Sequence, residues 1–207
     1  MRYNQWDNEI YGGINLIIRP MTASDCWSID QAFLAQQWPS RQATLERYLQ
    51  EQSRGLRQVF VAEDSGQIAG YATLIPHAKA GPFKKNGYPE ITDLNVFQNF
   101  QRQGIGAKLL QAAEEQAKTF SSVITIGVGL HSGYGTAQRL YLKNGYLPDG
   151  SGVWFENQVL AMGAACYNND DLVLYLSKSF WQATSVLFLS NRYNLQKIRW
   201  TSMLGAY

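Results

Sequence analysis

The sequence predicts a single α/β domain in which helices flank a central mixed sheet. Short runs rich in β-branched and aromatic residues alternate along the chain with longer segments whose apolar residues recur at helical spacing. The chain has 207 residues, of which 45% are hydrophobic, and this is enough to bury one substantial core. So much apolar material with a net charge of only +2 excludes an intrinsically disordered chain.

The first predicted elements are a strand and a helix. The strand covers residues 15–19, and the helix follows it to about residue 35. Thr22 and Asp25 have the spacing of a capping box, with Asp in place of the usual Glu, so the helix is expected to begin there.

A second helix and a β-hairpin come next. Ser40 is the expected N-cap of this helix, and Gly55 is its expected C-cap. Two strand-like runs, 58–63 and 68–74, are joined by Asp64-Ser65-Gly66, a short glycine-containing loop that is typical of a hairpin. The sequence therefore predicts an antiparallel pair at this point.

The second half of the chain begins with a long connection, residues 76–89, whose length suggests a functional role. Strands and helices then alternate again, which completes the layered pattern. The expected elements are a strand at 90–97, a helix at 104–120 with Phe120 on its buried face, a strand at 123–128, a helix at 135–143 and a strand at 172–176.

The most informative segment, Glu90 to Gly106, places a strand, a tight polar turn and a helix start in direct succession. Backbone N–H groups in such a turn and in the first helical turn converge on one point and bind an anion without charged side chains. Gly104 and Gly106 carry no Cβ, so a phosphate can approach the backbone closely. The segment is thus predicted to bind a phosphate group.

Two common phosphate-binding loops are excluded by the residues around this turn. A dinucleotide-binding loop needs a third small residue where Leu109 stands, and a Walker A loop needs Gly-Lys-Ser/Thr, which the sequence lacks. The remaining pattern, Gln101-Arg102-Gln103-Gly104-Ile105-Gly106, resembles the Q/R-x-x-G-x-G/A pyrophosphate loop of the GNAT superfamily of N-acetyltransferases, which bind acetyl-coenzyme A (acetyl-CoA).

Flanking segments carry the same resemblance. Leu94-Asn95-Val96 is similar to the family's L-x-V strand, and residues 137–146, AQRLYLKNGY, are similar to its A-x-x-L-Y-x-K-x-G-F/Y segment. The resemblance covers about residues 14–180 and implies a GNAT domain over 1–180 with a mostly antiparallel sheet. It also implies an enzyme that moves an acetyl group from acetyl-CoA to a primary amine by direct attack, with no covalent enzyme intermediate.

The resemblance further implies catalytic roles. Tyr141 corresponds to the family tyrosine that lies beside the coenzyme sulfur, where a phenol delivers a proton to the departing thiolate. Glu90 stands where histone-acetylating members carry their base. Asp93 lies on the same predicted strand and is the other candidate, or else it binds a cationic amine or forms a structural pair. Alternation along the strand puts Glu90 and Asp93 on opposite faces, so only one of them is expected to reach the substrate.

The coenzyme contacts that the resemblance implies come mainly from the main chain. The N–H of Val96 is expected to donate to the acetyl carbonyl, and the polar loop is expected to hold the pyrophosphate. These loop residues are Gln101, Arg102, Gln103, Gly104, Ile105, Gly106 and Ala107. Tyr134 stands where many members carry an asparagine that contacts the pantetheine arm, so that contact is either absent or made by different groups.

A small-molecule amine is the expected acceptor, because no extended peptide-binding signature is visible in the sequence. A peptide or protein amine is the alternative within the enzymes, and a non-catalytic sensor that binds acyl-CoA is the alternative outside them. A longer acyl donor also stays open. Residues 148–150 and 170–175 are similar to a bacterial subgroup of the family that has no assigned substrate.

Composition excludes several other classes of protein. The body of the chain is nearly neutral and offers no basic surface for nucleic acid. No apolar run approaches the roughly 18 residues that a membrane helix needs. The N-terminus lacks the apolar core of a secretory signal, so a cytoplasmic protein is expected. The two histidines and two cysteines form no cluster with metal-ligand spacing, and no metal is expected.

The C-terminal segment, residues 181–207, extends beyond the resemblance. It contains Arg192, Lys197 and Arg199 but no acidic residue, together with several aromatic side chains. We expect this extension to pack on its own domain or on the second subunit of a homodimer.

Overall fold

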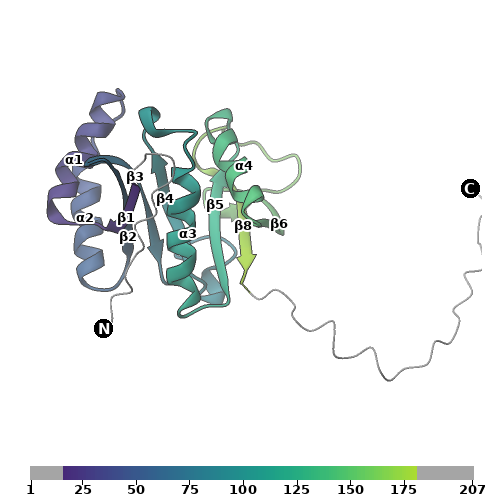
Figure 1. Ribbon diagram of the computed structural model, residues 1–207. Helices are drawn as coiled ribbons and strands as arrows, with labels where there is room; N and C mark the ends of the chain where they lie inside the picture. The colour runs from purple at the N-terminus through teal and green to yellow at the C-terminus, as the bar shows by residue number, and fades with distance from the viewer. Residues whose placement is uncertain (1–15, 181–207) are drawn as a thin grey trace, which may run out of the picture.

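The structure, a computed structural model of the chain, describes residues 16–180. Eight strands of this part form one sheet in the order β1-β2-β3-β4-β5-β8-β6-β7 (Figure 1). Their bounds are β1 Leu16–Pro20, β2 Gln58–Asp64, β3 Gln67–Ile75, β4 Glu90–Val96, β5 Val123–Gly129, β6 Leu147–Phe155, β7 Gln158–Val159 and β8 Leu172–Ser179. Every neighbouring pair is antiparallel except β4 and β5, which confirms the predicted mixed, mostly antiparallel sheet. The predicted C-terminal extension lies outside the described residues.

Helices cover both faces of the sheet. They are α1 Ala23–Ala35, α2 Gln42–Ser53, α3 Ile105–Lys118 and α4 Gly135–Lys143, with short 3-10 turns η1 Lys84–Asn86, η2 Gln98–Phe100 and η3 Ser132–Tyr134. Figure 1 shows α1 and α2 together beside β1 to β3, and α3 in front of the centre of the sheet.

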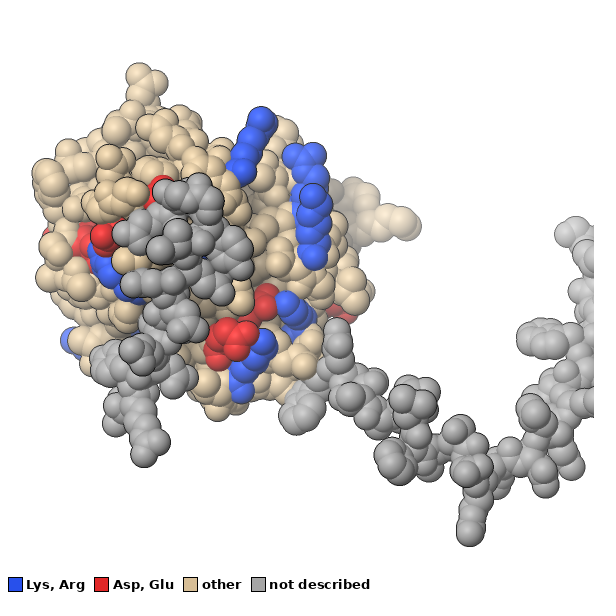
Figure 2. All heavy atoms as spheres, in the orientation of Figure 1, with Lys and Arg blue, Asp and Glu red and all other residues tan. Residues whose placement is uncertain are grey.

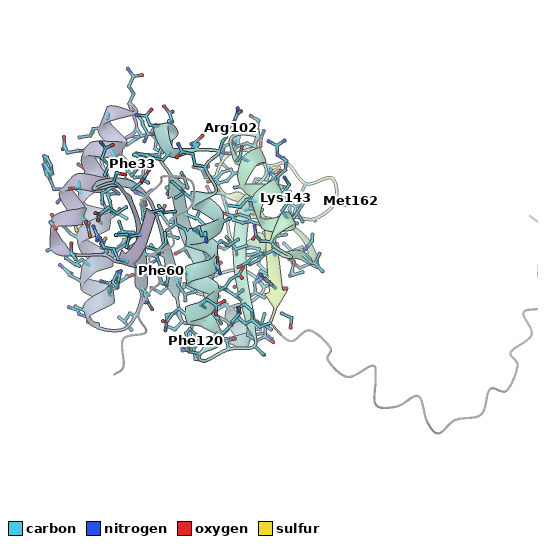
Figure 3. All side chains as sticks on the ribbon, in the orientation of Figure 1. Phe33, Phe60, Arg102, Phe120, Lys143 and Met162 are labelled. Atoms are coloured by element: carbon cyan, nitrogen blue, oxygen red, sulfur yellow. The ribbon has the colours of Figure 1, made fainter. Side chains whose placement is uncertain are left out.

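Strand β2 separates two hydrophobic cores because its side chains alternate between the two faces. Val59 and Val61 pack with residues of α1 and α2, such as Phe33, whereas Phe60 and Ala62 pack with residues of α3. Figure 3 labels Phe33 and Phe60, which mark these two cores. The sheet is therefore fixed by packing from both sides.

The helix starts near the N-terminus differ in how well the sequence predicts them. The capping box of α1 is confirmed, since the Asp25 carboxylate accepts the Thr22 N–H at 2.7 Å. The predicted start of α2 at Ser40 is wrong by one position, and Arg41 is the N-cap. The reason is Asp30, whose carboxylate accepts both the Ser40 hydroxyl at 2.9 Å and the Arg41 N–H at 2.5 Å.

Two other expectations about the fold are wrong. The sequence did not predict strands β6 and β7, because glycines such as Gly150 and Gly152 are typical of turns. In the structure both glycines lie within β6 and have a positive φ of 85°. Phe120 was expected on the buried face of a helix running to residue 120. Helix α3 instead ends at Lys118, and Phe120 is 50% exposed at its end (Figure 3).

A fork between β4 and β5 positions the site. These parallel strands pair only at Glu90 with Thr125 and at Ile91 with Ile126, and no pairing follows. Antiparallel partners β3 and β8 hold the outer sides of the two strands. The sheet is therefore split along the rest of β4 and β5, toward the end at which α3 begins.

Candidate active site

The split opens into a cavity of about 800 Å³. Almost all of the residues that the sequence predicts for the site line it. They are Glu90, Asp93, Val96, Gln101, Arg102, Gly104, Ile105, Gly106, Ala107 and Tyr141. Gln103 is the exception, because its side chain turns back to donate to the Asn99 carbonyl at 3.2 Å. Segments far apart in the sequence thus meet in one cavity.

The polar loop has the geometry of an anion site. Gly104 is the N-cap of α3 and adopts the left-handed conformation, with φ of 81°. The N–H groups of Ile105 and Gly106 donate to no residue within the described range, and a Cβ on Gly104 would meet nothing within 4 Å. Figure 3 shows Arg102 at this end of α3. Open space above unpaired donors at a helix N-terminus suits a phosphate.

The two glycines of the loop serve different purposes. We expected both to give a phosphate room, and this holds for the open space at Gly104. A Cβ on Gly106 would instead lie 3.2 Å from a methyl carbon of Leu140 and 3.6 Å from one of Val96. Gly106 therefore allows α3 to pack closely against α4 and β4.

The end of β4 presents a main-chain donor to the split. The Phe97 N–H donates to the Ala69 carbonyl of β3 at 3.0 Å, so by alternation the Val96 N–H points the other way, toward β5. The Val96 carbonyl lies on that same side, where it accepts the side-chain amide of Gln101 at 3.0 Å. Gln101 thus ties the polar loop to the strand end.

Tyr141 enters the cavity from α4. Its side chain is 5% exposed, and its ring centroid lies 6.1 Å from that of Tyr146. Burial raises the pKa of the Tyr141 phenol well above its ordinary value. The phenol therefore keeps its proton at neutral pH.

Glu90 is a buried carboxyl group that borders the cavity where β4 and β5 begin to part. It is 8% exposed, and no side chain or N–H within the described range donates a hydrogen bond to it. Burial raises the pKa of Glu90 to about 7. A carboxyl group with this pKa exchanges its proton near neutral pH.

The prediction that Glu90 and Asp93 lie on opposite faces is wrong. Both line the same cavity, because β4 has a bulge at Asp93, whose φ is +56°. The two carboxyl groups nevertheless differ strongly. Asp93 accepts hydrogen bonds from the Tyr48 hydroxyl at 2.9 Å and the Tyr71 hydroxyl at 3.0 Å, and it forms an ion pair with Arg41.

Tyr134 occupies the far end of the split. Its ring lies against Gly129, and its hydroxyl donates to Asp170 at 3.1 Å. Asp170 also lies 3.0 Å from Nε2 of His131, whose Nδ1 accepts the Gly133 N–H at 3.1 Å. Because Nδ1 is an acceptor, Nε2 carries the proton and donates to Asp170. Tyr134 is therefore held in place by two neighbouring loops.

Comparisons with known proteins agree with this geometry. The sequence profile of the acetyltransferase (GNAT) family matches residues 23–146, which is more than half of the chain. The chain belongs to the GNAT family. It is an acetyl-CoA-dependent N-acetyltransferase. A comparison with curated protein sequences finds no match.

Solved structures of the same fold include several GNAT enzymes. A GNAT family acetyltransferase from Elizabethkingia anophelis with acetyl-CoA bound is 22% identical, with a TM-score of 0.51 over 80% of this chain and 98% of that one. The ribosomal-protein-alanine N-acetyltransferase from Brucella melitensis is 20% identical, with a TM-score of 0.58 over 79% and 99%. A chimera of the spermidine N-acetyltransferase from Vibrio cholerae is 18% identical, with a TM-score of 0.58 over 80% and 95%.

Among the residues that line the cavity of this GNAT domain without a predicted role are Trp38, Arg41 and Tyr175. Trp38 and Arg41 come from the connection between α1 and α2, and Tyr175 comes from β8. Burial, with smaller effects of Glu90 and Asp149, raises the pKa of Tyr175 to about 12. No local motif marks Trp38 or Arg41, and the segment 170–175 predicts no role for Tyr175. Only the tertiary fold brings these three side chains to the split.

The described part of the chain offers neither a metal-binding cluster nor a helix that could span a membrane. No group of three or more His, Cys, Asp or Glu side chains in residues 16–180 is arranged to hold a metal ion. None of the helices in that range combines the length and the apolar character that crossing a bilayer requires.

Proposed function

We propose that this acetyltransferase acetylates a primary amine of a small molecule and that Glu90 is its general base. The observation that carries the proposal is the Glu90 carboxyl group, which is buried at the fork of the cavity, lacks a hydrogen-bonding partner among the described residues and has a pKa of about 7. A general base works best when its pKa lies near the operating pH. Glu90 meets this condition, whereas the carboxylate of Asp93 is already engaged by several hydrogen-bond donors.

Tyr141 is the proposed general acid. Attack by the neutral amine forms the N–C bond and breaks the C–S bond of the thioester. The amine proton passes to Glu90, directly or through a water, and the departing sulfur takes the phenol proton of Tyr141. Because its pKa is raised, the Tyr141 phenol keeps its proton at neutral pH and is available as a donor to the sulfur when negative charge develops there.

The remaining loop residues are proposed to hold the donor. The N–H groups of Gly104, Ile105 and Gly106 would bind the pyrophosphate, with Gln101, Arg102 and Gln103 around them. Ala107, whose N–H donates to the Gly104 carbonyl at 3.0 Å, would complete the binding turn at the start of the helix. Figure 2 shows Lys and Arg side chains without Asp or Glu over α4 and the nearby end of α3, which favours an anionic ligand on this side. The Val96 N–H would donate to the acetyl carbonyl and stabilise the negative charge that develops there.

The limited volume on the acceptor side favours a small molecule. Trp38 and Arg41 border it on one side and Tyr175 on the other, and the cavity holds about 800 Å³ in total. Much of this volume is needed for the pantetheine arm of the donor. An amine on a peptide or protein is the alternative, and the structural relatives named above include an enzyme of each kind.

The test measures release of the coenzyme thiol with a panel of small amines and of peptides with free amines. We expect turnover with small amines. Tyr141→Phe should lower kcat about 10- to 100-fold while acetyl-CoA affinity stays within about threefold. Tyr146→Phe is the matched control, because this neighbouring tyrosine does not line the cavity, and it should leave kcat unchanged.

Three other outcomes would contradict the proposal. Turnover with peptides alone would establish the alternative acceptor. Tight acetyl-CoA binding without turnover of any amine would indicate a sensor. An unchanged kcat in Tyr141→Phe would remove Tyr141 as the acid.

A further inference from the structure

We propose that Asp93 is a positioning residue that holds the bulge of β4 and thereby aims the Val96 N–H into the split. The inference rests on the proposed role of Val96 as a donor to the acetyl carbonyl. It replaces the expectation that Asp93 is a candidate base.

The bulge is visible in the pairing of β3 with β4. Thr92 pairs with Thr73 and Asn95 pairs with Tyr71, so two residues of β4, Asp93 and Leu94, lie opposite a single residue of β3. Asp93 occupies the left-handed region, with φ of +56°, which is unfavourable for a residue with a side chain. Other interactions must offset this local strain.

The bulge decides which N–H of β4 faces the thioester. Successive N–H groups of a strand point to alternate edges, so one extra residue reverses the direction of every N–H that follows it. With the bulge, the Phe97 N–H bonds to β3 and the Val96 N–H faces the split. Without it, these two N–H groups would exchange directions.

The Asp93 side chain is the anchor of the bulge. Its Oδ2 accepts the hydroxyls of Tyr48 and Tyr71 and pairs with Arg41, and its Oδ1 accepts the Asn95 amide at 2.7 Å. These donors come from α2, from its N-cap, from β3 and from β4 itself. They lock the carboxylate from several directions, and they compete with the amine proton for its oxygens.

Arg41 connects this anchor to the acceptor side of the cavity. Its backbone N–H is held by Asp30 of α1, and its guanidinium lies 5.5 Å from the ring centroid of Phe33. The wall formed by the α1–α2 connection and the bulge of β4 are therefore one packed unit. This explains why Arg41 lines the cavity although it is distant from the coenzyme loop in the sequence.

The experiment compares Asp93→Ala and Asp93→Asn with Glu90→Gln. The dissociation constants of acetyl-CoA and of free CoA are measured by calorimetry, and kcat/KM is measured against pH. Asp93→Ala should bind free CoA within about threefold of the wild type, because the pyrophosphate loop is intact. The ratio of the acetyl-CoA to the CoA dissociation constant should rise about tenfold, and kcat should fall about 100-fold through loss of the carbonyl donor.

The pH profile separates positioning from catalysis. In Asp93→Ala the acidic limb near pH 7 should stay in place, whereas Glu90→Gln should abolish it. Asn tolerates the left-handed conformation and offers one acceptor oxygen, so Asp93→Asn should recover kcat to within about tenfold of the wild type. A kcat within threefold of the wild type in Asp93→Ala, or loss of the limb near pH 7 in both Asp93 variants, would overturn the proposal.

The role of Asp93 can still be tested if Asp93→Ala does not fold or if the wild type acetylates no amine. If Asp93→Ala does not fold, Tyr48→Phe, Tyr71→Phe and the double variant remove the donors and leave the strand unchanged. Their kcat should fall stepwise at a constant pH profile, and an unchanged kcat in the double variant overturns the proposal. If the wild type acetylates no amine, the proposed function fails, while the ratio of the two dissociation constants still tests the role of Asp93.

Discussion

Glu90 pairs with Thr125 at the start of the short parallel ladder between β4 and β5, and the strands separate two residues further on. The carboxyl group therefore sits at the fork of the split, where the sheet is still closed on one side. This explains how the Glu90 carboxyl group can be only 8% exposed and still line the cavity. Its burial is the cause of its raised pKa. The position that buries the proposed base also places it at the edge of the cavity.

Activity should depend on the ionisation of Glu90. Since its pKa is about 7, kcat/KM should fall about tenfold per pH unit below pH 7. Glu90→Gln cannot take up a proton, so it should lower kcat/KM at pH 8 by about 100-fold and remove this acidic limb. Initial rates between pH 5.5 and pH 9 measure both effects. If kcat/KM of Glu90→Gln still falls below pH 7, the ionisation belongs to another group.

The same substitution should stabilise the protein at alkaline pH. The pKa of Glu90 rises from an ordinary value of 4.5 to about 7 on folding, so the ionised form is disfavoured in the folded state. The contribution of protonated Glu90 to stability is complete below pH 4.5 and is lost as pH rises through 7. At pH 8.5, Glu90→Gln should therefore unfold with a free energy about 3 kcal/mol higher than the wild type, and at pH 4.5 the two should be equal. Denaturant titrations at pH 4.5 and pH 8.5 measure the difference in unfolding free energy between Glu90→Gln and the wild type. The same difference at both pH values would show that the charge on Glu90 does not cause the effect.

Gly104 should be necessary for donor binding, and Gly66 provides a matched control. Both glycines have φ of +81°, and a Cβ on either would meet nothing within 4 Å. Gly104→Glu places a negative charge beside the proposed pyrophosphate site and should weaken acetyl-CoA binding more than 100-fold. Gly66→Glu introduces the same strain and charge in the β2–β3 turn and should leave binding unchanged. Calorimetry on both variants tests this, and equal affinities would show that the loop does not bind the pyrophosphate.

Local patterns account for the parts of the site that the sequence predicts well. The loop from Gln101 to Ala107 is contiguous, and its anion-binding geometry depends on a glycine at a helix start, which is visible in the sequence. Tyr141 was found in the same way, because its neighbours in α4 form a continuous motif. A site that is formed by one contiguous segment can therefore be recognised from a local sequence motif.

The acceptor side could not be predicted, because it depends on long-range register. Alternation along β4 placed Glu90 and Asp93 on opposite faces, and only the register of β4 against β3 reveals the bulge that brings them together. Tyr48 of α2 and Tyr71 of β3 then hold Asp93 in place. Arg41 has no motif of its own, and its partner Asp93 is 52 residues away. Such contacts are determined by how the helices pack on the sheet.

The ion pair between Lys178 and Glu114 should contribute to stability but not to activity. The Lys178 ammonium lies 2.7 Å from the carboxylate of Glu114, which is 7% exposed between α3 and β8. Lys178→Met leaves a buried carboxylate without its cation and should cost about 3 kcal/mol. The control is Lys118→Met, which breaks an exposed pair with Glu115 and should cost less than about 1 kcal/mol. Urea titrations of both variants measure the two costs, and equal costs would show that burial of the pair does not matter.

Gly129 and Tyr134 should behave as a coupled pair. A Cβ on Gly129 would lie 2.4 Å from the Tyr134 ring, a distance that forces the ring to move. Gly129→Ala should therefore break the hydrogen bond from Tyr134 to Asp170 and destabilise the fold by about 1–3 kcal/mol. In the background of Tyr134→Ala the ring is gone, so the same substitution should cost less than about 0.5 kcal/mol. A double-mutant cycle by denaturant unfolding measures the coupling. Additive costs would show that the strain at Gly129 comes from the strand itself, whereas strong coupling would establish that β5 carries a glycine at this position to seat the Tyr134 ring at the mouth of the split.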